Sequence, residues 1–161
     1  MNQRMQGIIR FVIGIIVCEG AGIIGSIFTT SAIPTWYATL KKPVFSPPNW
    51  LFAPVWGILY LLMGVSAAII WQRGLSEPPV RKALIIFIIQ LALNILWSAA
   101  FFGLRSPLAG MIVIVALWVA ILFTILSFFR ISSFAAFLLV PYILWVSFAT
   151  ILNFTIWQLN P

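Results

Sequence analysis

The chain has 161 residues, of which 63% are hydrophobic and 7% charged, and its mean hydropathy is +1.16. A soluble domain of this size has no interior large enough for so much apolar surface, so the composition indicates one domain, residues 1–161, almost entirely within a membrane. The nine basic residues give a net charge of +7, but they stand singly or in pairs and form no stripe for nucleic acid.

The chemistry-bearing residue types are few. The chain has no His, a single cysteine (Cys18), and two acidic residues, both glutamates. This excludes a Ser/His/Asp or Cys/His catalytic arrangement, a metal centre of the usual ligands and an intrachain disulfide. We therefore expect no resident cofactor.

Five apolar stretches are each long enough to cross a hydrocarbon core, which takes about 20 helical residues. In chain order they are residues 7–28, 49–72, 83–103, 108–129 and 133–157. Backbone groups in lipid must bond within their own segment, and the alternation of barrel strands is absent, so these stretches are predicted to be helices. Short connections make neighbours antiparallel. The predicted fold is an all-α membrane bundle of five transmembrane helices.

The first connection, residues 29–48, is long. Within it Ile33, Trp36, Tyr37 and Leu40 have the spacing of one face of a short amphipathic helix, and Pro34 suits its first turn. Two interpretations are open: a helix lying among the lipid headgroups, or a lid over the mouth of the bundle.

The basic residues predict the orientation. The N-terminal side of the bundle carries Arg4, Arg10, Arg73, Arg81, Lys82 and Arg130, and the other side carries Lys41, Lys42 and Arg105. Basic residues are enriched on the cytoplasmic side, so we expect the N-terminus in the cytoplasm and the first loop and C-terminus outside.

The first stretch carries small residues every fourth position, at Gly14, Cys18, Gly22 and Ser26. Such rows let helix backbones approach closely, inside the bundle or between two copies. Glu19 lies deep in the same stretch, where an ionised carboxylate costs about 2.5–3.5 kcal/mol. It is either a neutral group bonded to a neighbouring helix or a group that contacts a ligand or handles protons.

A rise of about 1.5 Å per residue puts several polar and aromatic side chains in one layer, roughly 9–18 Å below the side of the first loop. They are Glu19, Trp56, Asn94, Trp97, Trp145 and Ala149. The three tryptophans are too deep for an interfacial belt. They either line a ligand cavity or fill the core.

Four segments resemble one known family. Residues 36–50 read WYATLKKPVFSPPNW, residues 54–64 PVWGILYLLMG, residues 90–103 QLALNILWSAAFFG and residues 141–157 PYILWVSFATILNFTIW. In this order they resemble the translocator protein family, whose members are also called tryptophan-rich sensory proteins or peripheral benzodiazepine receptors.

The resemblance implies a five-helix bundle, commonly a homodimer, that binds porphyrins such as protoporphyrin IX and haem, and benzodiazepine- or isoquinoline-type ligands, in a cavity beneath the first loop. The positions that match the family's ligand site are Trp36, Phe45, Pro47, Trp56, Tyr60, Asn94, Trp97, Trp145 and Ala149. Some bacterial members are described as degrading porphyrin in light, with tryptophans that match Trp56 and Trp145.

One motif departs from the family's animal members. Their sterol-recognition pattern has a Tyr and a basic residue where this chain has Phe154 and Gln158. Motifs of this kind are weak evidence for sterol binding even when complete. The departure favours a bacterial member in the cell membrane.

Three functions follow as hypotheses. The first is a membrane receptor or sensor for porphyrins and drug-like hydrophobic ligands, which could also transport them. The second is a protein that degrades its porphyrin in light. Catalysis in the dark is disfavoured, because acid–base chemistry would have little beyond Glu19 to use and Glu77 lies in a distant loop. The third is a small-molecule exporter, for which Glu19 alone would supply a charged path.

Overall fold

The computed structural model describes residues 2–161, apart from the side chain of Gln3. Its helices are α1 (Gln3–Ala32), α2 (Asn49–Gln72), α3 (Pro78–Ser98), α4 (Pro107–Phe129), α5 (Ser133–Leu138) and α6 (Val140–Leu159), with π-helical turns η1 (Ile33–Tyr37) after α1 and η2 (Ala99–Gly103) after α3. Five of the resulting segments are long and apolar enough to span a membrane. The chain is an all-helical, multi-pass membrane protein, as the sequence predicts.

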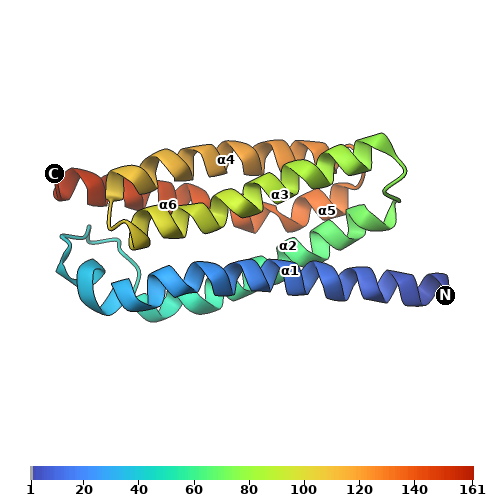
Figure 1. Ribbon diagram of the computed structural model, residues 1–161. Helices are drawn as coiled ribbons and strands as arrows, with labels where there is room; N and C mark the ends of the chain where they lie inside the picture. Colours follow the sequence, from blue (N-terminus) through green and yellow to red (C-terminus); the bar gives the residue numbers. More distant parts are fainter. Residues whose placement is uncertain (1) are drawn as a thin grey trace.

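Figure 1 shows the long helices running antiparallel to their neighbours in sequence. The N-terminus and the connections α2–α3 and α4–α5 lie at one end of the bundle. The first loop, the α3–α4 connection and the C-terminus lie at the other. The helices α1 and α2 pack together along one side, and α3, α4 and α6 make up the other (Figure 1).

The first helix differs from the predicted one. It begins at Gln3 and continues without a break through η1, so the short amphipathic helix expected within residues 29–48 is its C-terminal extension. A proline in an α-helix lacks the N–H for the helical bond, and its ring clashes with the preceding turn. The wider turn of η1 avoids this clash and so accommodates Pro34. Ile33, Trp36, Tyr37 and Leu40 do face the protein, as their spacing predicts. The connection that remains, residues 40–48, is called the first loop below.

Prolines also move two other boundaries. Helix α3 begins at Pro78, five positions before the predicted start, because prolines fit the first turn of a helix. The last predicted helix is divided at Leu139 into α5 and α6, since Pro141 can donate no backbone bond to the turn before it.

The small residues of α1 pack inside the bundle. A Cβ atom on Gly14 would lie 2.6 Å from the carbonyl oxygen of Gly64 on α2, and one on Gly64 would lie 2.6 Å from the Cα of Ile15. Cys18 is buried. The first two positions of the row therefore face the protein interior and let α1 and α2 approach closely.

Candidate functional site

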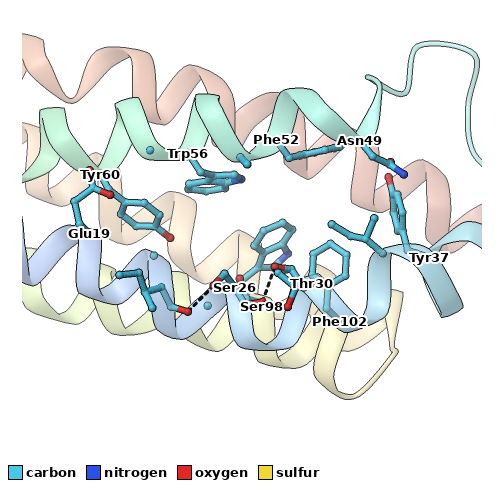
Figure 2. Close-up of a pocket in the computed structure, with 18 residues that line it drawn as sticks. Glu19, Ser26, Thr30, Tyr37, Asn49, Phe52, Trp56, Tyr60, Ser98 and Phe102 are labelled. Carbon is cyan, nitrogen blue, oxygen red and sulfur yellow. Dashed lines mark hydrogen bonds between the residues drawn. The ribbon is translucent and has the colours of Figure 1, made fainter.

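A cavity of about 310 Å³ lies between α1, α2 and the C-terminal end of α3 with η2. Figure 2 shows Glu19 and Tyr60 at one end of it and Tyr37 and Asn49 at the other. The end with Asn49 adjoins the first loop, and Asn49 is exposed there. We call the end with Glu19 the inner end and the end with Asn49 the mouth.

Aromatic rings form one wall of this cavity. Trp56 stacks on Tyr60 with ring centroids 5.6 Å apart and lies 6.2 Å from the ring of Trp97. At the mouth, Tyr37 of η1 and Phe102 of η2 contact each other at 5.7 Å. The two π-helical turns thus each contribute an aromatic side chain to the wall, and such turns are frequent at functional sites.

Helix α1 supplies the opposite wall through residues without bulk. A Cβ on Gly22 would lie 2.6 Å from the ring of Tyr60, and one on Gly25 would lie 3.2 Å from the Ser98 hydroxyl. Ser26 and Thr30 continue this wall towards the mouth. The spacing of this row predicts close helix packing. The hydroxyl residues that follow the glycines on the same face were the signal that it also lines a cavity.

Glu19 lines the inner end, one helical turn before Gly22. Its side chain is partly buried. The sequence leaves two interpretations of Glu19 open. Its place in the cavity wall fits the second, in which the carboxyl group can contact a ligand.

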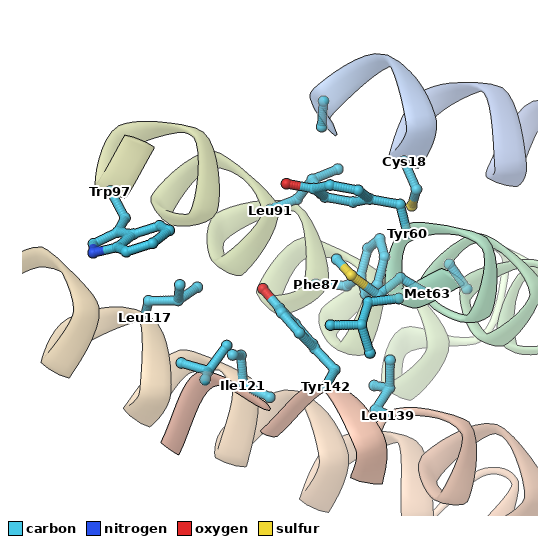
Figure 3. Packing of buried hydrophobic residues seen from close by; sticks show 14 of the residues in the cluster. Cys18, Tyr60, Met63, Phe87, Leu91, Trp97, Leu117, Ile121, Leu139 and Tyr142 are labelled. Carbon is cyan, nitrogen blue, oxygen red and sulfur yellow. The ribbon is translucent and has the colours of Figure 1, made fainter. Parts of the chain in front are cut away.

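A chain of buried polar groups stands behind the aromatic wall. The Tyr60 hydroxyl donates to Oδ1 of Asn94 at 2.5 Å, Asn94 Nδ2 donates to the Tyr142 hydroxyl at 2.8 Å, and that hydroxyl donates to Oε1 of Gln90 at 2.8 Å. Figure 3 shows both tyrosines within the apolar cluster that includes Met63. Asn94 is 1% exposed, so it holds Tyr60 in place from behind and is not itself part of the cavity wall.

Ala149 lines a second, smaller cavity of about 30 Å³, together with Leu152 and Ile156 of α6. Four aromatic side chains border both cavities and separate them, namely Tyr37, Phe52, Trp97 and Phe102. Rotation of these rings would join the two spaces.

The remaining predicted residues lie around the main cavity. Trp145 contacts Phe52 at 6.1 Å, and its indole Nε1 is buried without a hydrogen-bond partner. Trp36 packs edge-on against Phe101 at 5.5 Å. Of the nine predicted positions, the cavity is lined by Trp56, Tyr60 and Trp97.

The first loop lies next to the mouth and packs against α6. Phe45 packs against Phe148 with centroids 6.4 Å apart, and Pro47 is partly buried. The side chain of Asn160 accepts from the backbone N–H of Lys41 and donates to its carbonyl oxygen, both at 3.0 Å. This pair of bonds fastens the loop to the C-terminal end of α6.

Across residues 2–161, no group of three or more His, Cys, Asp or Glu side chains is arranged to hold a metal ion. The site is thus an apolar, aromatic cavity with one carboxyl group and several hydroxyl groups on its walls. Together with five spanning helices, it defines a membrane protein with a ligand-sized internal cavity.

Comparison with known proteins identifies the family. Residues 14–158 match the TspO/MBR family, and the chain belongs to that family. A tryptophan-rich protein TspO of Chlorobaculum tepidum is 49% identical over 161 residues, the whole of both chains. A protein of the same name from Archaeoglobus fulgidus is 45% identical over 155 residues, 96% of this chain and 99% of its own. The human translocator protein is 37% identical over 139 residues, 85% of this chain and 82% of its own.

Proposed function

We propose that the protein is a membrane receptor that binds flat, hydrophobic ligands, with porphyrins such as protoporphyrin IX and haem as the natural class and benzodiazepine- or isoquinoline-type molecules as others. The observation that carries the proposal is the stack of Trp56, Tyr60 and Trp97 along one wall of the cavity. Aromatic faces favour contact with other flat π systems, and few polar groups interrupt this wall.

The size of the cavity bears on how such a ligand enters. Its volume of about 310 Å³ is at the lower end of the range of about 300–1,000 Å³ typical of ligand sites. A tetrapyrrole therefore requires the space around Ala149 as well, which is reached when the separating rings of Phe52 and Trp97 rotate. Of the predicted ligand residues, Ala149 would then contact the bound molecule beside Trp56, Tyr60 and Trp97, and Trp145 would come within reach once Phe52 has moved.

The proposal extends to the setting of the protein. We place it in a bacterial cell membrane as a homodimer, with the N-terminus in the cytoplasm and the cavity mouth on the outer side, where a ligand could be sensed or transported. Cysteine accessibility in whole cells would test the orientation, using a cysteine in place of Ser46 in the first loop in a Cys18→Ala background. Light scattering of the detergent-solubilised protein would test the dimer.

Light-dependent degradation of the bound porphyrin is the second candidate function. It is favoured by the position of Trp56 in the cavity wall, in ring contact with Tyr60 and Trp97. Incubation with protoporphyrin IX in the dark and in light separates the two functions. Loss of the porphyrin absorption in light alone supports degradation, and an unchanged spectrum in both supports binding only.

The binding function has a direct test in two glycines. A Cβ on Gly57 or on Gly20 would meet no atom within 4 Å, but only Gly57 lines the cavity. Gly57→Leu should fill the cavity and abolish the quenching of tryptophan fluorescence by protoporphyrin IX. Gly20→Leu, the matched control, should bind as the unaltered protein does. Equal binding by both variants would place the ligand outside this cavity.

A further inference from the structure

The charge distribution along the cavity is one-sided. Among the eighteen described residues that line it, Glu19 is the only one with a charged side chain, and it lies at the inner end beside Tyr60 (Figure 2). Nothing in the proposed function, which rests on the aromatic wall, uses this carboxyl group.

The hydroxyl groups along the cavity, from Tyr60 beside Glu19 to Thr30 near the mouth, already donate their protons. The Tyr60 hydroxyl donates to Asn94, the Ser26 hydroxyl donates to the carbonyl oxygen of Ile23 at 2.7 Å, and the Thr30 hydroxyl donates to the carbonyl oxygen of Ser26 at 2.9 Å. A hydroxyl group whose proton is engaged still has lone pairs to offer. These groups can therefore accept a hydrogen bond from a ligand without breaking a bond of their own.

Two basic groups beyond the ends of the cavity each lie over an aromatic ring. Arg10, on the same helix, is about 13 Å from Glu19 along the helix axis. Its guanidinium lies over the ring of Trp71 at 5.9 Å. At the mouth, the Lys42 ammonium lies over the ring of Tyr37 at 4.7 Å. A carboxylate at this depth is costly unless it is paired. No described basic residue forms an ion pair with Glu19, so a cation that enters the cavity would supply the partner.

We propose that the inner end of the cavity recognises a hydrogen-bond donor group, and a protonated amine or amidine in particular, carried on a flat apolar body. This rests on the proposed function, because the aromatic wall must hold that body. Glu19 forms a charge-assisted hydrogen bond with the donor group, and the Tyr60 hydroxyl supplies a second acceptor. An anionic group on the same ligand stays at the mouth, near the amide of Asn49 and the ammonium of Lys42.

Three pyrene derivatives of nearly equal shape test the inference. They are 1-pyrenemethylamine, which is cationic, 1-methylpyrene, which is neutral, and 1-pyrenecarboxylate, which is anionic. Binding is measured by energy transfer from tryptophan to pyrene, with the protein in nanodiscs of zwitterionic lipid and empty nanodiscs as the partition control. A charge-assisted hydrogen bond corresponds to roughly tenfold in affinity or more, so the amine should bind about tenfold more tightly than the neutral pyrene.

The variants assign this preference to its residue. Glu19→Gln should abolish it and leave the affinity for 1-methylpyrene unchanged. Glu77→Gln, the matched control, removes the same charge at the start of α3, far from the cavity, and should retain the preference. Tyr60→Phe keeps the ring, removes the second acceptor and should reduce the preference about threefold, which gives an independent test if Glu19→Gln does not fold.

The two proposals fail in different ways. Equal affinity of the amine and the neutral pyrene for the unaltered protein, or a preference that survives Glu19→Gln, would overturn the inference and leave the binding cavity in place. If none of the three pyrenes binds the unaltered protein, the proposed function fails with it.

Discussion

The two sides of the bundle use their polar residues in opposite ways. Along α1, the hydroxyl groups of Ser26, Thr29 and Thr30 donate to carbonyl oxygens of their own helix and leave the space towards α2 open. Between α3, α4 and α6, polar side chains bond across helices. Trp97 Nε1 donates to Oδ1 of Asn153 at 3.2 Å, and Asn153 Nδ2 donates to the carbonyl oxygen of Pro107 at 2.7 Å.

The difference shows how a membrane bundle can hold a cavity. Bonds between helices fix the α3–α4–α6 side, and each contributes about 0.6 kcal/mol on average in membrane proteins. Helix α1 has the small residues that make room, and its hydroxyl groups donate within their own helix instead of across to another. A ligand site therefore forms where the small-residue face of α1 meets the aromatic residues of α2 and α3.

The closest contact between α1 and α2 offers the strongest test of this comparison. Gly64→Ala would place a Cβ 2.6 Å from the Cα of Ile15, so the helices must move apart. Overpacking of this kind costs about 1–3 kcal/mol, and the melting temperature should fall. Gly20→Ala, where a Cβ meets no atom within 4 Å, should leave it unchanged or raise it. Equal melting temperatures would show that α1 is not held against α2 at Gly64.

The bonded side has its own test at Asn153, which is 2% exposed. Asn153→Ala removes both of its bonds and leaves the Trp97 indole and the Pro107 carbonyl group without a partner. We expect a loss of about 1–2 kcal/mol in the free energy of unfolding. Thr155→Ala removes only a bond to its own helix and should change stability little. An equal loss in both variants would contradict the contrast between the two sides.

The smaller cavity tests whether ligands extend beyond the aromatic partition. Ala149→Leu fills the space beside Trp97 and should weaken the binding of protoporphyrin IX about tenfold, measured by fluorescence titration, because about 1.4 kcal/mol of contact is lost. Ile151→Leu on the exposed face of α6 is the control. Unchanged affinity in a folded Ala149→Leu protein would confine the ligand to the larger cavity.

The two tryptophans proposed for photochemistry should differ in effect. Trp56 lines the cavity, whereas Trp145 reaches it only through Phe52. Trp56→Phe should reduce ligand quenching several-fold more than Trp145→Phe, since energy and electron transfer weaken with distance. If both substitutions leave affinity, quenching and photochemistry unchanged, the ligand binds elsewhere.

The smallest effect is expected at the first loop. Asn160→Ala removes the two bonds to the backbone of Lys41, and loop residues should exchange their amide hydrogens a few-fold faster, because lids come from the less stable parts of a fold. Protoporphyrin IX should slow this exchange in the unaltered protein. Identical exchange with and without saturating ligand would show that the loop is static and does not act as a lid over the mouth.

Much of the fold follows from the sequence, because a bilayer requires long apolar helices and short loops fix their directions. Helix α2 has the predicted bounds, and α4 begins one residue early. The larger changes of boundary lie at prolines, at Pro34, Pro78 and Pro141, whereas α1 also begins four residues early at Gln3. At the prolines the local pattern does not tell whether the chain ends a helix, starts one or continues through a wider turn.

The aromatic part of the site was predicted through the family resemblance, and Trp56, Tyr60 and Trp97 do lie together on one wall. The pairing of this wall with the small-residue face of α1 was not predicted. Spacing shows which residues of a helix share a face, but it does not show which helix that face meets.

The sequence by itself determined that the chain spans a membrane five times, which family it resembles and which aromatic residues lie at one depth, because these depend on composition and on the rise of a helix. The tertiary structure alone decided that Asn94 lies behind Tyr60, that Trp145 lies behind Phe52 and that Glu19 lines the inner end of the cavity. The physical reason is that the sequence does not fix how each helix is rotated about its own axis. The depth of a residue follows from counting along a helix, whereas the direction of its side chain is set by the packing of all the helices against one another.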